Sequence, residues 1–200
     1  MENNSNSIQQ VITQFVLIVF SVVLGLYLSE RIEESKKRKE SEVLLGRIEA
    51  EVKDNISLLR EWLPYHQEMH KNLDSLSNDE AFITEFINNK YTFYKTLVTR
   101  GTFMGRTPAN DAWDIAKANP LITNIEYEKL LILSRVYNQQ ASTYGVLFEV
   151  FAIINAKDFN AETDAKINLE VLADRLHEFV AREKQLMYYF NESEGILDLK

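Results

Sequence analysis

Two histidines four residues apart are the first side chains whose type and spacing could do chemistry. His66 and His70 occur in the sequence PYHQEMH, and residues at positions i and i+4 lie on one face of a helix. Two imidazoles placed in this way can bind a metal ion. The zinc-protease motif differs, because it needs Glu directly after the first His, and Gln67 stands there. His177 is the only other histidine, so we predict no metal site and expect an exposed helix near a kink.

Arg60 and His66 form a second pattern. Their Arg-x5-His spacing is similar to that of helical ribonucleases of the HEPN type, although Glu61 follows the Arg where a polar neighbour is usual there. An enzyme built on these residues would need Arg60, His66 and His70 to converge in a cleft. The chain has no G-x-S-x-G, phosphate-loop or glycine-rich nucleotide motif. We therefore predict a protein that is not an enzyme and holds no cofactor.

The amino-acid composition narrows the possible functions and the fold class of the protein. The chain has 200 residues, with 30 acidic and 22 Lys or Arg side chains, and a net charge of −8. This balance disfavours nucleic acid as a partner, because phosphate binding needs clustered Lys and Arg. The absence of cysteine excludes disulfides, thiolate nucleophiles and Cys-ligated metals. With 46% hydrophobic residues but only six Gly and three Pro, the chain is expected to be all-α.

A long uncharged segment lies near the N-terminus. No charged side chain occurs between Glu2 and Glu30, and 13 of the 18 residues from Val11 to Leu28 are Val, Ile, Leu or Phe. As a helix, residues 8–28 span about 30 Å, the thickness of the hydrocarbon core of a bilayer. The preceding residues 1–7 form a polar tail that lacks the basic residues of a signal peptide. We predict one transmembrane helix that stays attached, with the lipid bilayer as a partner.

The flanks of this segment predict its orientation. No Lys or Arg precedes it, whereas five follow closely, namely Arg31, Lys36, Lys37, Arg38 and Lys39. Basic residues favour the cytoplasmic side of a membrane. We therefore expect a single-pass protein with its C-terminal domain in the cytoplasm.

Polar and small residues gather on one face of the predicted span. Gln14, Ser21 and Gly25 are separated by seven and four residues, which places them in line along a helix. Small residues let helices approach closely in lipid, and Gln can bond across the interface. These residues are a candidate packing face for self-association. Their occurrence can also be incidental, since Ser and Gly are common in single spans.

Residues 29–42 are highly charged and contain one apolar side chain, Ile32. This composition predicts a solvated helical stalk, stiffened by ion pairs of Glu33 with Lys37 and Glu34 with Arg38. A lipid-binding basic patch is the alternative, but five Glu offset the five basic residues.

Residues 43–200 are predicted to form an antiparallel helical bundle. The apolar period is helical over residues 43–63, where Pro64 should end or kink the helix, and a short helix should follow as far as residue 76. We expect Asp79 to cap the next helix, a helical piece up to Leu97 and then a loop. Three later helices are expected. Thr107 and Pro108 should open the first, which should bury Ile115. Asn124 should cap the second, which should run to residue 154, and the third should cover residues 164–190 and bury Ile167 and Val171.

Three segments together carry a resemblance to a family. The first is LGLYLSERIEESKKRKE, the second is IEAEVKDNISLL with Glu51 and Asn55, and the third is TPANDAWDIAKANPLITNIEYEKLLILSRVYNQQ with Trp113 and Tyr137. They resemble an uncharacterised family of bacterial single-span membrane proteins. Where that family often has Gly after the Trp helix, this chain has Ala118, Asn119 and Pro120. The resemblance implies a helical domain anchored in a bacterial inner membrane and supplies no reaction.

These observations favour a scaffold or interaction module, which binds a protein partner or associates with itself through the span. Two alternatives remain open. One is a ligand-sensing input domain for signalling, which predicts a pocket between the long helices. The other is an oligomeric membrane effector or pore, in which several spans assemble around Gln14 and Ser21.

Overall fold

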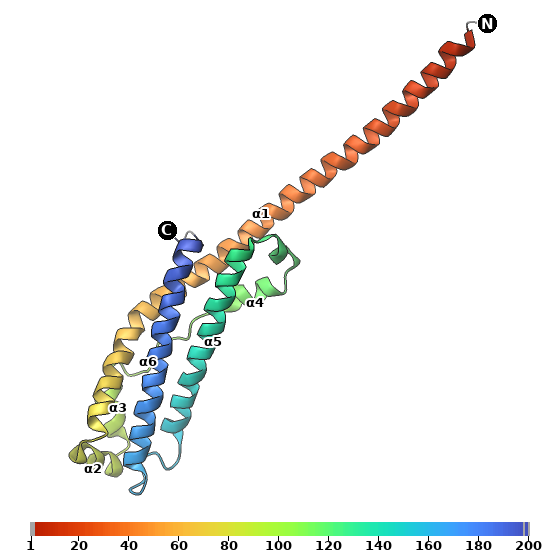
Figure 1. Cartoon of the computed structure of the whole chain (residues 1–200). Helices are drawn as coiled ribbons and strands as arrows, with labels where there is room; N and C mark the ends of the chain where they lie inside the picture. Colours follow the sequence, from red (N-terminus) through yellow and green to blue (C-terminus); the bar gives the residue numbers. More distant parts are fainter. Residues whose placement is uncertain (1–2, 198, 200) are drawn as a thin grey trace.

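The computed structural model describes the backbone of residues 3–197 and 199 and the side chains from residue 13 onward, again without residues 198 and 200. Every regular element in this part of the chain is helical, so the predicted all-α class is confirmed. Figure 1 shows a bundle of helices from which the N-terminal part of α1 projects. Residues 1 and 2 of the predicted polar tail lie outside the described residues.

The first helix, α1 (Asn3–Leu76), contains 74 residues and is about 110 Å long. Pro64 lies inside it and does not end it, contrary to the prediction of two separate helices. Proline removes one backbone hydrogen bond, but the next turns are held by burial of Tyr65, Met69 and Leu73 at 4%, 2% and 1% exposure. Packing on the core therefore carries α1 past the proline, and the helix curves along the bundle (Figure 1).

The N-terminal part of α1 has two exposed sections. Apolar side chains from Phe15 to Leu28 are exposed, and this section makes α1 the one candidate membrane span among the described residues. The predicted stalk, residues 29–42, is helical and exposed up to Ser41, where burial in the bundle begins. The predicted pair of Lys37 with Glu33 is present, with 2.7 Å between nitrogen and oxygen.

The predicted ion pair of Glu34 with Arg38 is not formed, because each side chain pairs with another residue of the stalk. Glu34 lies 3.9 Å from Arg31 instead of pairing with Arg38, and Arg38 lies 3.7 Å from Glu42. All these side chains are exposed, so each pair contributes little to stability.

The core forms where α1 meets two long helices, α5 (Tyr127–Asn155) and α6 (Ala165–Ile196). These two run antiparallel, as the contacts of Gln139 with Gln185 and of Ser142 with Arg182 require. Ile167 and Val171 of α6 are 58% and 43% exposed, so the prediction that they are buried is wrong. Leu169, Leu172 and Ala173 occupy the core side of this part of α6 instead.

Two short helices, α2 (Glu80–Asn88) and α3 (Tyr91–Leu97), close the end of the bundle that lies far from the N-terminus (Figure 1). Asp79 caps α2 as predicted, because its carboxylate accepts bonds from the backbone N–H groups of Ala81 and Phe82. The expected helix ending at Leu97, followed by a loop, is also present. Gly101 in this loop has a φ of +75°, a left-handed conformation that favours glycine.

The segment between α3 and α5 contains α4 (Asp111–Lys117) and the 3-10 helix η1 (Pro120–Asn124). Thr107 and Pro108 do not open α4, which starts three residues after Pro108. Asn124 does not cap α5, because it belongs to η1 and Glu126 precedes α5. Ile115 of α4 is 64% exposed, not buried as predicted. Contacts with α1 determine where α4 begins.

Candidate functional site

Glu51 of α1 holds the start of α4. Its carboxylate accepts hydrogen bonds from the backbone N–H groups of Ala112 at 2.8 Å and Trp113 at 3.4 Å, and from the Tyr137 hydroxyl at 2.6 Å. The first N–H groups of a helix have no partner within the helix, and a carboxylate satisfies both their hydrogen bonds and their partial positive charge. Glu51 therefore caps α4 from another helix, in place of the local cap predicted at Thr107.

Asn55 lies one turn after Glu51 and is fully buried. Its amide binds both backbone groups of Ala109, since Nδ2 donates to the Ala109 carbonyl at 2.7 Å and Oδ1 accepts from the Ala109 N–H at 2.9 Å. The same Nδ2 donates to Oε1 of Gln140 at 3.2 Å, and Gln140 Nε2 donates to the Ala109 carbonyl at 3.0 Å. This two-sided contact fixes the chain just before α4.

Trp113 and Tyr137 complete the cluster. Their rings stack with centroids 5.3 Å apart and an angle of 4° between the planes. Burial and the bond to Glu51 raise the pKa of Tyr137, so its hydroxyl stays protonated and donates to the carboxylate. We call Glu51, Asn55, Trp113, Tyr137 and Gln140 the polar latch, because they join α1, α4 and α5.

The polar latch brings together all four residues that the family-like segments singled out. Sequence reasoning missed Gln140, although it lies three residues after Tyr137 and thus on the same side of α5. Within the latch, the described hydrogen bonds of Glu51 and Asn55 go to backbone and side-chain groups of the protein itself. The arrangement serves to hold the segment before α5 against α1.

A groove lies beside the polar latch, with a volume of about 430 Å³. Trp113, Tyr137 and Tyr144 contribute to its lining, and Gly145 and Phe148 of α5 border it. A Cβ atom added at Gly145 would meet nothing within 4 Å, and the Phe148 side chain is 66% exposed. The groove thus has an open glycine position beside an exposed aromatic ring.

A second polar cluster lies in the core and corrects the prediction for His66. This histidine is fully buried, not exposed, and its Nδ1 lies 2.9 Å from both carboxylate oxygens of Glu183, which is also fully buried. Its Nε2 lies 2.7 Å from the carbonyl oxygen of Phe103. Burial raises the pKa of Glu183, while the bond to His66 opposes this change. The pair therefore joins α1 to α6 and to the loop that contains Phe103.

Because both imidazole nitrogens of His66 face oxygen atoms, the His66–Glu183 pair must share one proton to satisfy both contacts. That proton lies either on the imidazole or on the carboxyl group. The hydroxyl of Tyr144 is buried without a hydrogen-bond partner among the described residues, and burial and Glu183 raise its pKa. The His66 and Glu183 side chains are both fully buried, which argues for a structural role of this pair.

The other chemistry-bearing residues do not converge. Arg60 is exposed and its guanidinium lies 2.9 Å from Glu194, whereas His66 points into the core. His70 lies at the surface against His177 of α6, and burial and that neighbour lower the pKa of His70. Arg60, His66 and His70 therefore share no cleft. No group of three or more His, Asp or Glu suited to a metal ion occurs in the described part of the chain.

The predicted packing face lies on the exposed section of α1. Gln14, Ser21 and Gly25 are exposed, and a Cβ atom added at Gly25 would meet nothing within 4 Å. The Ser21 hydroxyl donates to the Leu17 carbonyl of the same helix at 2.7 Å. The face is thus open to another helix. The Ser21 hydroxyl already has a hydrogen-bond partner within its own helix.

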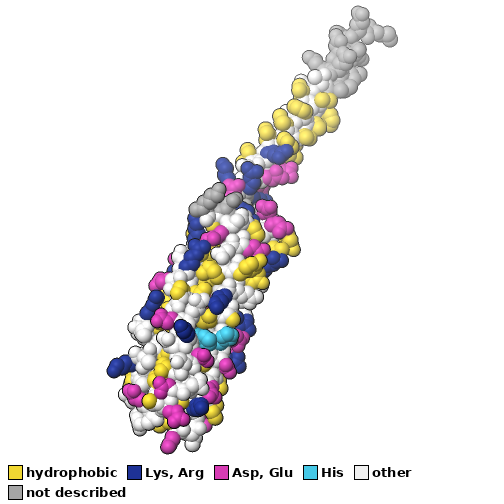
Figure 2. Space-filling model, turned by 60° about the vertical axis from the view of Figure 1, so that its left-hand side comes forward, with side chains coloured by type: hydrophobic (Ala, Val, Ile, Leu, Met, Phe, Trp, Pro, Cys, Tyr) yellow, Lys and Arg dark blue, Asp and Glu magenta, His cyan; other side chains and the backbone are white. Residues whose placement is uncertain are grey.

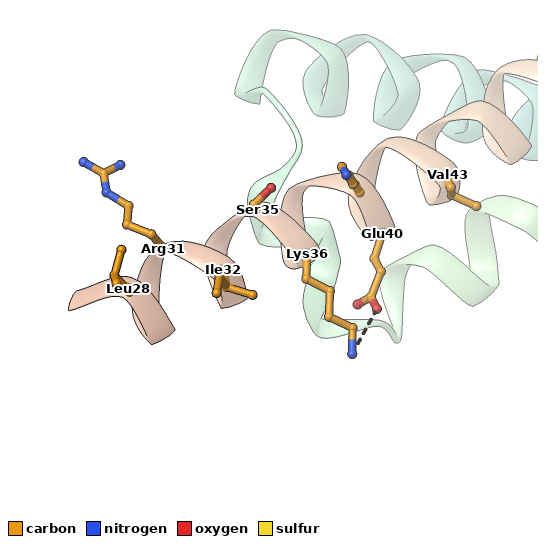
Figure 3. A pocket seen from close by; sticks show the side chains of 8 residues that line it. Leu28, Arg31, Ile32, Ser35, Lys36, Glu40 and Val43 are labelled. Carbon is orange, nitrogen blue, oxygen red and sulfur yellow. Dashed lines mark ion pairs between the residues drawn. The ribbon is translucent and has the colours of Figure 1, made fainter. Parts of the chain in front are cut away.

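A hollow along the stalk has no opposing wall. All eight side chains that line it belong to α1, including Leu28, Ile32 and Val43, with the ion pair of Lys36 and Glu40 between them (Figure 3). A strip on a single helix cannot enclose a ligand, so we do not treat it as a binding pocket.

Comparisons with known protein families, with curated proteins and with solved structures find no match for the chain.

Proposed function

We propose that the chain is a membrane-anchored helical interaction module. The observation that carries this proposal is the continuity of α1, whose apolar section has no buried residue while its C-terminal part forms part of the bundle core. Exposed apolar side chains in such number are unfavourable in water and favourable in lipid. The stalk then holds the bundle away from the bilayer surface.

The proposed orientation has the bundle in the cytoplasm of a bacterium, with the span in the inner membrane. It rests on the five basic residues that follow the span and on the family resemblance. The absence of cysteine makes the test direct, since one cysteine can be placed in the tail as Ser5→Cys or on the bundle as Ser75→Cys, at an exposed position near the C-terminal end of α1. On intact cells an impermeant maleimide should label the first variant alone. Label on Ser75→Cys would refute the orientation, and release of the protein by alkaline carbonate would refute the anchor.

We further propose that the chain associates with itself through Gln14, Ser21 and Gly25. Close approach of two helices at this face would suit the open position at Gly25. The test is the mass of the full-length protein in detergent, measured by light scattering with detergent correction. Gly25→Leu should lower the mass to that of one chain, whereas Val23→Leu, on the opposite side of the helix, should not. A wild-type protein of single-chain mass would contradict the proposal.

The groove beside the polar latch is the surface that we propose for a protein partner. An exposed aromatic ring with polar groups around it is typical of the residues that dominate protein interfaces. Asp114 and Lys117 of α4 supply charges at its edge, and Phe148 supplies the ring. Proximity labelling in cells should identify proteins that Phe148→Glu loses and Tyr91→Glu keeps, since Tyr91 is 77% exposed at the far end of the bundle. Equal loss in both variants would contradict a partner at the groove.

A further inference from the structure

His70 and His177 lie side by side although they come from different helices. Their ring centroids are 5.0 Å apart, and the planes are inclined by 53°. His66 is buried, so the histidine patch visible on the surface in Figure 2 belongs to this pair. By helical spacing alone, the neighbour of His70 would be His66, one turn earlier on the same helix.

The distance between these rings suits a shared metal ion. Imidazole nitrogen binds Zn²⁺ at about 2.0–2.1 Å, so two imidazoles at a tetrahedral angle have centroids about 5.3 Å apart. The observed 5.0 Å is close to this value. Neither imidazole has a hydrogen-bond partner among the described residues that fixes its rotamer, so both side chains can rotate to direct one nitrogen to a common point.

The surroundings leave room for the ion. Both rings line a hollow of about 410 Å³ together with Gln67, Val180, Ala181 and Lys184. Asp74 and Asp174 are close enough to act electrostatically on His70, and Lys184 acts on it with the opposite sign. The two carboxylates offset the repulsion that the lysine exerts on a cation.

We propose that His70 and His177 form a two-histidine site for a divalent transition-metal ion such as Zn²⁺, which joins α1 to α6. Water completes the coordination, because no third His, Asp or Glu ligand is in place among the described residues. The site is independent of the proposed interaction function. An ion that binds only the folded bundle stabilises it by mass action.

The test is the thermal unfolding of full-length protein without a histidine tag, in detergent at pH 7.5. Addition of 100 µM ZnCl₂ should raise the wild-type Tm by about 3–6 °C over an EDTA-treated sample, if the dissociation constant is about 10 µM. His70→Asn and His177→Asn should each abolish this rise. Lys184→Gln should enlarge it, because it removes the repelling charge and leaves both ligands.

Isothermal titration of the wild-type protein with ZnCl₂ supplies a second measurement that does not depend on unfolding. One Zn²⁺ bound per chain, lost in His177→Asn, would support the site. Absence of a rise in Tm together with absence of binding heat would overturn it. A rise of equal size in both histidine variants would overturn it as well, because His66 is then the only remaining histidine common to all samples and is buried.

Discussion

Replacing Asn55 by Ala tests whether the polar latch holds the bundle together. The change leaves two groups without this partner, the N–H of Ala109 and Oε1 of Gln140, while the Ala109 carbonyl keeps its 3.0 Å bond from Gln140. An unsatisfied buried polar group costs about 1–3 kcal/mol. Gln140 is 5% exposed and Ala109 is partly buried, so we expect the free energy of unfolding to fall by about 3 kcal/mol.

The assay is urea unfolding of the full-length protein in detergent, followed by tryptophan fluorescence, since Trp113 belongs to the latch. The midpoint should fall while the slope stays constant, as expected when only stability changes. Ser57→Ala is the matched control, because Ser57 is exposed on the same helix and its hydroxyl bonds the Lys53 carbonyl one turn earlier. A loss below about 0.5 kcal/mol, or equal losses in the two variants, would refute the reasoning.

Three further outcomes follow from the core pair and one loop. Glu183→Ala should lower the free energy of unfolding by about 3–5 kcal/mol, because His66 loses its buried partner. Glu183→Gln should lower it less, since the glutamine amide can donate to Nδ1 of His66. Urea unfolding of the two variants measures the difference. The raised pKa of Glu183 means that the folded protein retains a proton that the unfolded chain releases above about pH 4.3, so this group's contribution to stability should decrease as pH rises from there. Glu183→Gln should remove that part of the pH dependence, and an unchanged profile would contradict it. Gly101→Ala should lower stability by about 1–2 kcal/mol because of its positive φ, with Gly46→Ala, a helical position with open space, as the control that does not.

Local patterns predicted the helices better than they predicted where helices begin. The apolar period located the three long helices, and Asp79 marked the start of α2 correctly. The start of α4 could not be read in this way, because its first N–H groups bind Glu51, 61 residues earlier in the chain. Pro64 likewise predicts an end only when the residues after it have nothing to pack against.

The histidines show the same limit for the site. Spacing along the chain put His66 and His70 on one helical face, but four residues span 40° of rotation, enough for one side chain to enter the core and the other to reach the surface. The partner of His66 is 117 residues away, and no local feature of the sequence marks it. The family resemblance singled out Glu51, Asn55, Trp113 and Tyr137. It did not predict that their side chains lie together, because they come from three different helices.

Because α1 is one continuous helix, it also fixes the rotation of the span about the helix axis relative to the bundle. Each residue of a helix turns the chain by about 100°, so the number of residues in the stalk sets the direction in which Gln14, Ser21 and Gly25 face relative to α5 and α6. Insertion of one residue would rotate that face by about 100°, whereas insertion of seven would return it to within about 20° and add roughly 10 Å. Two chains that met through this face would thus hold their grooves in one mutual orientation, set by residue count.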